Sequence, residues 1–144
     1  MRRSSHGGLL TLARRTFAAQ QHLQRLRQLV AKAARRVGLD HDRGNDLALA
    51  VSEAAANVIK HSGTVGRLEL IQDDNRALIA QITDHGPGMG SGTGSGMGPA
   101  HQPTLPSADH DSGRGLYLMH QLCDRVEHQS SPHGTTVRLE MNLK

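Results

Sequence analysis

The chain has 144 residues, of which 36% are hydrophobic and 21% are charged, so it is long enough for one globular domain and too apolar for a disordered segment. Phe17 and Tyr117 are its only aromatic residues, which excludes recognition of single-stranded nucleic acid by rows of stacking side chains. The single cysteine, Cys123, cannot form an internal disulfide and indicates a reducing compartment. No apolar run approaches the roughly 20 residues that span a bilayer, and no signal peptide is recognisable, so we expect no membrane partner and a cytoplasmic location.

The net charge of +4 is unevenly distributed. Residues 1–43 carry ten Lys or Arg residues against two acidic ones, a balance of +8, whereas the remainder carries seven against eleven, a balance of −4. A basic segment can indicate a nucleic-acid partner, an acidic protein partner or only a solvated helix face, of which the last is the commonest.

Five elements are predicted before residue 85. They are a strand at 9–17, a helix at 23–37, a second helix from a cap at Asp40 or Asp42 to about 61, and strands at about 65–72 and 78–84. Apolar residues recur at helical spacing in both helices, and Gly38 is the type of residue that ends one. In the strands the apolar residues alternate, and acidic and Asn residues supply the turn between them.

Residues 86–112 are predicted to form a long irregular segment. Every second residue from Gly86 to Gly98 is glycine, and three prolines follow. A structureless loop of roughly 20 residues or more inside a compact domain is uncommon unless it is a lid or a linker. Its position between ordered elements favours a lid over an ordinary flexible insertion.

The last predicted elements are a short helix that begins near Gly115 and two strands, one at about 125–129 and one after Gly134. Hairpins dominate the pairings, so we expect an α/β (α+β) two-layer sandwich with a mixed, mainly antiparallel sheet and helices on one face. One domain is expected to cover residues 1–144, with residues 1–8 flexible.

Glu53 and Asn57 are four residues apart on the second predicted helix, so they share one face. A carboxylate and an amide oxygen in this arrangement can serve a hard cation and polarise a hydroxyl group. Such a pair is also common on an ordinary helix surface. Its alanine neighbours leave room for a ligand close to the helix.

Asp84 and Thr135 are expected at the edge of the apolar layer of the sheet. Strand alternation places each of them on the same face as the apolar residues of its own strand. A carboxylate there needs a donor, which a ligand amino group or the capping of a turn would provide. The neighbouring glycines, Gly86 and Gly88, allow close approach of the backbone.

Gly113, Arg114 and Gly115 open the third predicted helix, where free N–H groups and the helix dipole favour phosphate, although an ordinary loop–helix junction has the same pattern. No Walker A sequence occurs. The ten histidines are scattered and have no cysteine cluster beside them, which argues against a zinc site.

The order of these motifs is more specific than any of them alone. Between residues 20 and 143 the chain resembles the GHKL ATP-binding superfamily, and most of all the anti-sigma factor serine kinases of bacteria. The residues that carry the resemblance are Ser52-Glu53-Ala54-Ala55-Ala56-Asn57, Asp84-x-Gly86-x-Gly88, Gly113-Arg114-Gly115-Leu116 and Gly134-Thr135-Thr136.

The resemblance implies a role for each of these residues. Asn57 would hold the Mg²⁺ of Mg-ATP, and Glu53 would be the general base toward a serine hydroxyl. Asp84 would accept a hydrogen bond from the adenine amino group, supported by Thr135. The remaining binding residues would shape the base pocket and wrap the phosphates beneath the 86–112 lid: Gly86, Gly88, Gly113, Arg114, Gly115 and Leu116.

The resemblance also implies partners, namely a sigma factor, a STAS-type antagonist that is phosphorylated on serine, and a second copy of the chain. One alternative is an ATP-binding module that switches partners without kinase turnover, because Ala56 stands where these kinases commonly have Thr. Another is a nucleic-acid binder that uses residues 1–43 and needs no ATP site. We expect no direct nucleic-acid binding.

Overall fold

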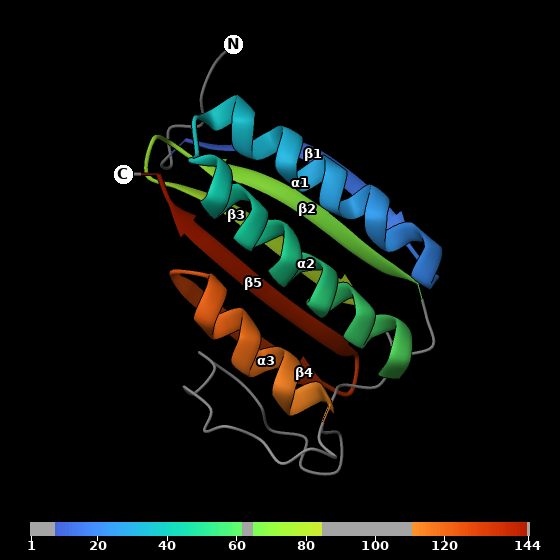
Figure 1. Ribbon diagram of the computed structural model, residues 1–144. Helices are drawn as coiled ribbons and strands as arrows, with labels where there is room; N and C mark the ends of the chain where they lie inside the picture. Colours follow the sequence, from blue (N-terminus) through green and yellow to red (C-terminus); the bar gives the residue numbers. More distant parts are fainter. Residues whose placement is uncertain (1–7, 62–64, 85–110, 144) are drawn as a thin grey trace.

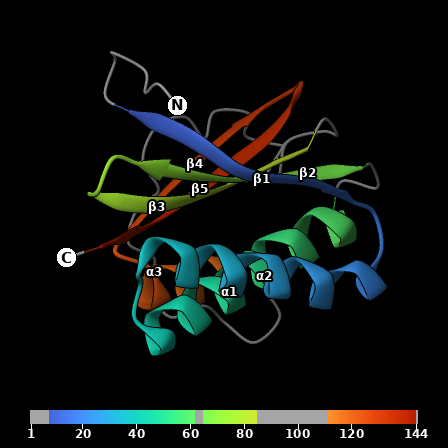
Figure 2. The same ribbon diagram turned by 90° about the horizontal axis from the view of Figure 1, so that it is seen from above.

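The computed structural model describes residues 8–61, 65–84 and 111–143, and for residues 111–116 it describes the backbone only. The described residues form a five-stranded sheet with three helices packed on one face (Figures 1 and 2). In chain order the elements are β1 (Leu9–Phe17), a short 3-10 turn η1 (Gln20–His22), α1 (Leu23–Val37), α2 (His41–His61), β2 (Gly66–Asp73), β3 (Ala77–Asp84), α3 (Asp111–Leu122), β4 (Arg125–Ser131) and β5 (Gly134–Asn142).

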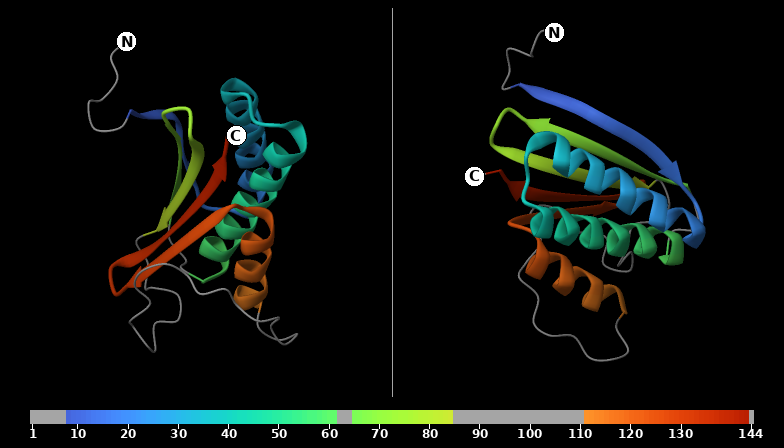
Figure 3. Two further views of the ribbon diagram at one scale, coloured as in Figure 1. Left: turned by 90° about the vertical axis from the view of Figure 1, so that its left-hand side faces the viewer. Right: turned by 45° about the horizontal axis from the view of Figure 1, so that its top comes forward.

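The sheet has the strand order β1-β2-β3-β5-β4, and all four pairings are antiparallel. The predicted two-layer sandwich is therefore confirmed, and the sheet of the described residues is antiparallel throughout, with no parallel pair. The two layers are seen edge-on in Figure 3. Because helices cover only one face, apolar residues alternate with polar ones along most of the strands.

The helix α1 ends where the sequence predicts. Gly38 adopts the left-handed conformation (φ 82°), and its N–H donates to the carbonyl of Arg35 at 3.2 Å. Leu26 and Val30 are fully buried against the rest of the chain. A methyl group at Gly44 of α2 would lie 2.9 Å from the Cβ of Ala34. Because Gly44 has no side chain, α1 and α2 can lie very close together at this point.

The core lies between the helices and the helix-facing side of the sheet. Leucine, isoleucine, valine and methionine side chains from four strands meet the small residues of α2 there. The strand residues of this layer are Phe17, Leu68, Leu70, Leu78, Ala80, Ile82, Val126, Val137, Leu139 and Met141. The many alanines of α2 allow the helix backbone to approach the sheet closely.

One helix boundary differs from the sequence-based prediction. The helix α3 begins at Asp111 and not near Gly115, so the irregular segment is shorter than predicted at this end. An acidic residue at a helix N-terminus is favourable, and a glycine inside a helix costs only about 1 kcal/mol, so the two glycines do not prevent the earlier start. At the other end of the chain, the carbonyl of Gly8 accepts a hydrogen bond from the N–H of Asp74 at 3.1 Å; residues 1–7 lie outside the described residues.

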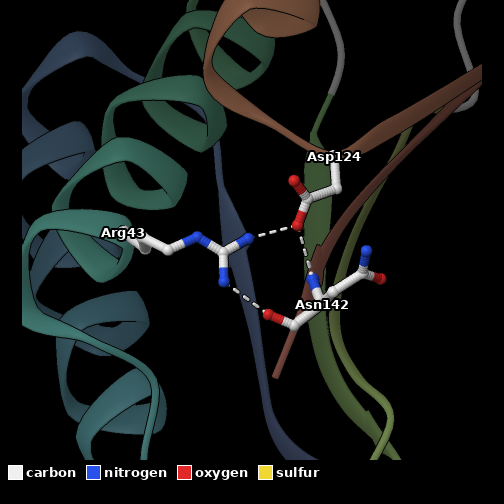
Figure 4. A network of polar contacts seen from close by, with 3 residues as sticks. All are labelled: Arg43, Asp124 and Asn142. Carbon is white, nitrogen blue, oxygen red and sulfur yellow. Dashed lines mark hydrogen bonds and ion pairs between the residues drawn. The ribbon is translucent and has the colours of Figure 1, made fainter. Parts of the chain in front are cut away.

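A polar network joins three elements at one end of the molecule (Figure 4). Arg43, in the first turn of α2, donates to the carbonyl of Asn142 at 2.6 Å and pairs with the carboxylate of Asp124. The same carboxylate accepts from the N–H of Asn142 at 2.7 Å. One guanidinium group thus fixes the start of α2, the α3–β4 junction and the end of β5 together. We call these three residues the Arg43 network.

Among the described residues, no helix is long and apolar enough to cross a membrane.

Candidate functional site

The second helix presents the first two site residues. Asn57 is buried, with 6% of its surface exposed, and Glu53 is half-buried one turn before it. Ala54 and Ala55 are buried and Ala56 is half-buried, so no large side chain separates the two polar groups. An amide oxygen at this position can ligate a hard cation, and a carboxylate within reach of solvent can accept a proton.

At one end of the sheet, a row of directly paired residues runs across all five strands. It contains one residue from each strand, and direct cross-strand partners share a face of the sheet. We call this set the buried row; in the order of the strands it is Phe17, Gly66, Asp84, Thr135 and Ser130. All five residues are buried on the helix-facing side. Each of the four that carry a side chain exposes at most 4% of its surface, and Gly66 is buried as well.

Asp84 and Thr135 are direct partners at the centre of the buried row. Their strand neighbours on the same face, Ile82 and Val137, belong to the core, so the predicted position at the rim of the apolar layer is confirmed. Both polar side chains have interaction partners in the structure. A carboxylate accepts hydrogen bonds, whereas a hydroxyl can donate and accept, so the pair can recognise a ligand with both a donor and an acceptor.

The sequence reasoning missed three members of the buried row. Phe17 and Gly66 are a direct pair between β1 and β2, and a Cβ at Gly66 would lie less than 3.0 Å from three atoms of the Phe17 ring. Ser130 lies opposite Thr135. The register of the β4–β5 hairpin would have found Ser130, since only Ser131–Gly134 separate it from Thr135. Phe17 and Gly66 are separated by two helices, so no local signal pairs them.

The Arg43 network shows which ends of the helices lie together. Because it joins the start of α2 to the end of α3, and Figure 1 shows these helices side by side, α2 and α3 run in opposite directions. Asn57 lies about 21 Å along α2 from Arg43 at 1.5 Å per residue. Thr135 lies about 23 Å along β5 from Asn142. Both residues are therefore at the end of the molecule opposite the network.

The first turns of α3 lie at this same end. Gly113, Arg114, Gly115 and Leu116 belong to the helix, and Gly113 is about 14 Å from its last residue. The predicted start near Gly115 placed Gly113 and Arg114 ahead of the helix, and this is corrected: both residues are inside it. The backbone thus brings the start of α3, the Asn57 end of α2 and the buried row to one end of the fold. The glycines at 86 and 88 and the lid lie outside the described residues.

Three titratable side chains lie where α3 meets β4. Burial lowers the pKa of His128, which is half-buried on the helix-facing side of β4, and also the pKa of His120 on α3. The Nε2 atoms of both rings are buried without a hydrogen-bond partner. Burial raises the pKa of the Cys123 thiol to about 12, so it stays protonated at neutral pH and is a poor nucleophile or metal ligand.

The residues present fit a nucleotide better than a protein-held metal. Within the residues that the structure describes, no group of three or more His, Cys, Asp or Glu side chains could hold a metal ion. A Mg²⁺ ion usually takes only one or two protein ligands and the rest from phosphates and water. Asn57 fits such a single ligand, and the buried carboxylate of Asp84 fits an amino donor of a base.

Comparison with known proteins shows what the chain is similar to. The model of the histidine kinase-like ATPase domain matches residues 17–141. A protein of Halalkalibacterium halodurans, named serine-protein kinase RsbW, is 32% identical over 108 residues, which is 71% of this chain and 65% of that protein. The chain thus spans a little less than two thirds of the length of this relative.

Among solved structures, the histidine kinase domain of the blue-light activated histidine kinase of Erythrobacter litoralis EL346 is similar with a TM-score of 0.51. The sequences are 16% identical, and the match covers 86% of this chain and 64% of that one. At this identity the match supports the fold, which is the same α/β arrangement of a sheet with helices on one side.

Proposed function

Because the chain belongs to the histidine kinase-like ATPase domain family, we propose that it binds Mg-ATP and acts in the cytoplasm as an anti-sigma factor with serine kinase activity. The observation that carries the proposal is the convergence of Glu53, Asn57 and the Asp84–Thr135 pair at one end of the fold. The similarity to a serine-protein kinase supports it. The kinase would sequester a sigma factor and phosphorylate a serine of a STAS-type antagonist.

Each side chain has a defined task in this mechanism. When bound, Mg-ATP supplies the phosphoryl group that is transferred to serine. Asn57 would hold the magnesium ion through its amide oxygen. Glu53 would take the proton of the serine hydroxyl, whose oxygen would replace the ADP oxygen on the γ-phosphorus, so that ADP is the leaving group. Glu53 is half-buried, so a substrate can reach it.

The base and the phosphates would be held by different elements. Asp84 would accept from the amino group of adenine, and the hydroxyl of Thr135 would support this contact. Gly113, Arg114, Gly115 and Leu116 would enclose the phosphates at the start of α3, where the N–H of Gly113, in the first turn, has no partner within the helix. Gly86 and Gly88 would complete the base pocket.

The outer surface of α1 and α2 is the proposed partner surface. α1 carries five basic residues and no acidic residue, which favours an acidic partner segment. A shallow groove between the two helices has Arg27 on one side and Leu49, 41% exposed, on the other. An acidic, amphipathic segment of the sigma factor or of the antagonist would fit this groove. We also propose that the chain forms a homodimer.

A second function is favoured by one residue. Ala56 precedes Asn57 where kinases of this group commonly have Thr, which is compatible with a module that binds ATP and switches partners without phosphoryl transfer. The two functions make different predictions for Glu53.

The test is incubation of the protein with labelled Mg-ATP and purified candidate STAS proteins. Glu53→Gln is expected to keep ATP and partner binding and to lose transfer by roughly 10²–10⁴-fold, the effect of removing a general base. Asn57→Ala is expected to weaken Mg-ATP binding itself. Glu127→Gln on the open face of the sheet is the matched control. Antagonists that are bound but never phosphorylated, or a Glu53→Gln variant with wild-type transfer, would support the switch and contradict the kinase.

A further inference from the structure

The single phenylalanine of the chain lies in the buried row, on the far side of Gly66 from Asp84. Phe17 is 1% exposed, although β1 is an edge strand whose other residues are mostly exposed. Residue 17 therefore differs from the rest of β1, because it buries a large aromatic side chain at the end of a mostly exposed strand. The neighbouring strand explains how this side chain is accommodated.

Gly66 is what allows the ring to reach across β2. The three ring atoms nearest to the Cβ position of Gly66 are Cζ and the two Cε atoms, so the distal edge of the ring lies over the glycine. No other residue type would leave this space, because any Cβ would lie less than 3.0 Å from the ring. The ring thus occupies the place that a side chain of residue 66 would take.

That place borders directly on Asp84. Gly66 and Asp84 are direct partners, and the Cβ positions of such partners are about 5 Å apart on one face. The distal edge of the ring therefore lies about 5 Å from the Cβ of Asp84, on the same face of the sheet. The edge of an aromatic ring is its electropositive part, so it tolerates the neighbouring anion, but it offers no hydrogen bond.

The two sides of Asp84 consequently differ. The β2 side is closed by an apolar ring, whereas the β5 side holds Thr135 and, beyond it, Ser130, both buried hydroxyls. On its β2 side the carboxylate thus meets a ring that offers no hydrogen bond, whereas on its β5 side it meets hydroxyls that can donate one. An acceptor that is held in one direction and shielded from water discriminates strongly between a donor and an acceptor on a ligand.

We propose that Phe17, reaching over Gly66, is a specificity-determining residue that orients the Asp84 carboxylate so that the site selects an adenine over a guanine nucleotide. This inference rests on the proposed nucleotide binding and deepens it. Phe17 acts through Asp84 and not by touching the base, so it is a positioning residue. Gly66 is its obligatory partner.

The experiment compares the affinities of ATP and GTP by calorimetry in the full chain. Phe17→Met is the main variant, because methionine keeps most of the volume and apolar character while it removes the ring. The expected result is a loss of ATP affinity of roughly tenfold with little change for GTP, so that the selectivity ratio falls. Gly66→Ala, which displaces the ring, is expected to lower the ratio similarly.

The combined variant Gly66→Ala with Phe17→Met is expected to show non-additive effects on the ratio, since both changes act on one contact. Leu70→Val is the matched control: it removes apolar volume from the same face of β2, away from the row, and should lower stability without changing the ratio. An unchanged ratio in folded Phe17→Met and Gly66→Ala, or an equal drop in Leu70→Val, would overturn the inference.

The failures of the two proposals are distinguishable. A wild-type protein that binds neither nucleotide contradicts the proposed function itself. A wild-type protein that binds ATP selectively, while its Phe17 variants keep that selectivity, leaves the proposed function intact and overturns only the role of Phe17. Equal wild-type binding of ATP and GTP also overturns it.

Discussion

Replacing Asp84 by asparagine tests the base-recognition site most directly, because it exchanges one carboxylate oxygen for an NH₂ group and keeps the shape of the side chain. Asp84 is 2% exposed, so water cannot replace a lost hydrogen bond. If the amide turns its NH₂ toward the adenine amino group, two donors face each other. Leaving such a group unsatisfied in a buried site costs about 1–3 kcal/mol, which corresponds to a loss of ATP affinity of about five- to 150-fold.

Calorimetric titration of the Asp84→Asn variant with Mg-ATP measures this loss, and circular dichroism with urea unfolding checks that the fold survives. Glu69→Gln is the matched control, since it is the same chemical change on the open face of the sheet, where Glu69 pairs with Arg14 at 3.0 Å. We expect the control to keep the wild-type ATP affinity. A folded Asp84→Asn variant with unchanged affinity would refute the assignment of this carboxylate to the base.

The remaining predictions concern stability, pH and partner association. Arg43→Gln removes a hydrogen bond and a partly exposed ion pair, so urea unfolding should show a loss of about 1–2 kcal/mol, whereas Arg125→Gln, whose pair is more exposed, should cost less. Because burial holds the pKa of His128 below its ordinary value of 6.5, the unfolded state takes up a proton first, and the free energy of unfolding should fall as the pH drops below about 6.5. His128→Leu should flatten this dependence, and His133→Leu, at an exposed position, should not; an unchanged slope in His128→Leu would contradict the argument. Stopped-flow mixing with an acidic partner should show association that slows with added salt and slows further in Arg27→Glu, and a salt-independent rate would argue against electrostatic steering.

Local signals in the sequence were sufficient for most of the fold. Gly38 ends α1 because a residue in the left-handed backbone conformation closes the helix there. The alternation of apolar and polar residues in β3 and β5 correctly placed Asp84 and Thr135 on the core side of the sheet. Arg14 and Arg15 interrupt the apolar alternation of β1, but the strand forms all the same, since an edge strand can expose residues on both faces. The start of α3 was misplaced because Gly113 and Gly115 resemble a loop in sequence.

The buried row could not be derived from the sequence in the same way. A register between β1 and β2 depends on how α1 and α2, which lie between them in the chain, pack on the sheet. No periodicity within either strand encodes that packing. Hence the sequence identified Asp84 and Thr135, which sit beside recognisable motifs, and missed Phe17 and Gly66, whose relation exists only once the sheet has formed.

The helix α2 contributes residues both to the proposed partner groove and to the proposed catalytic site. Arg27 of α1 donates to the hydroxyl of Ser52 at 3.5 Å, and Ser52 directly precedes Glu53. Because this hydrogen bond is long and the Arg27 side chain is exposed, an acidic group of a partner would compete well with the serine hydroxyl for the guanidinium. Ser52 is 5% exposed, so the hydroxyl that loses this donor must find another partner within α2. A partner in the groove would therefore change the hydrogen bonding of the residue next to Glu53 without entering the nucleotide site.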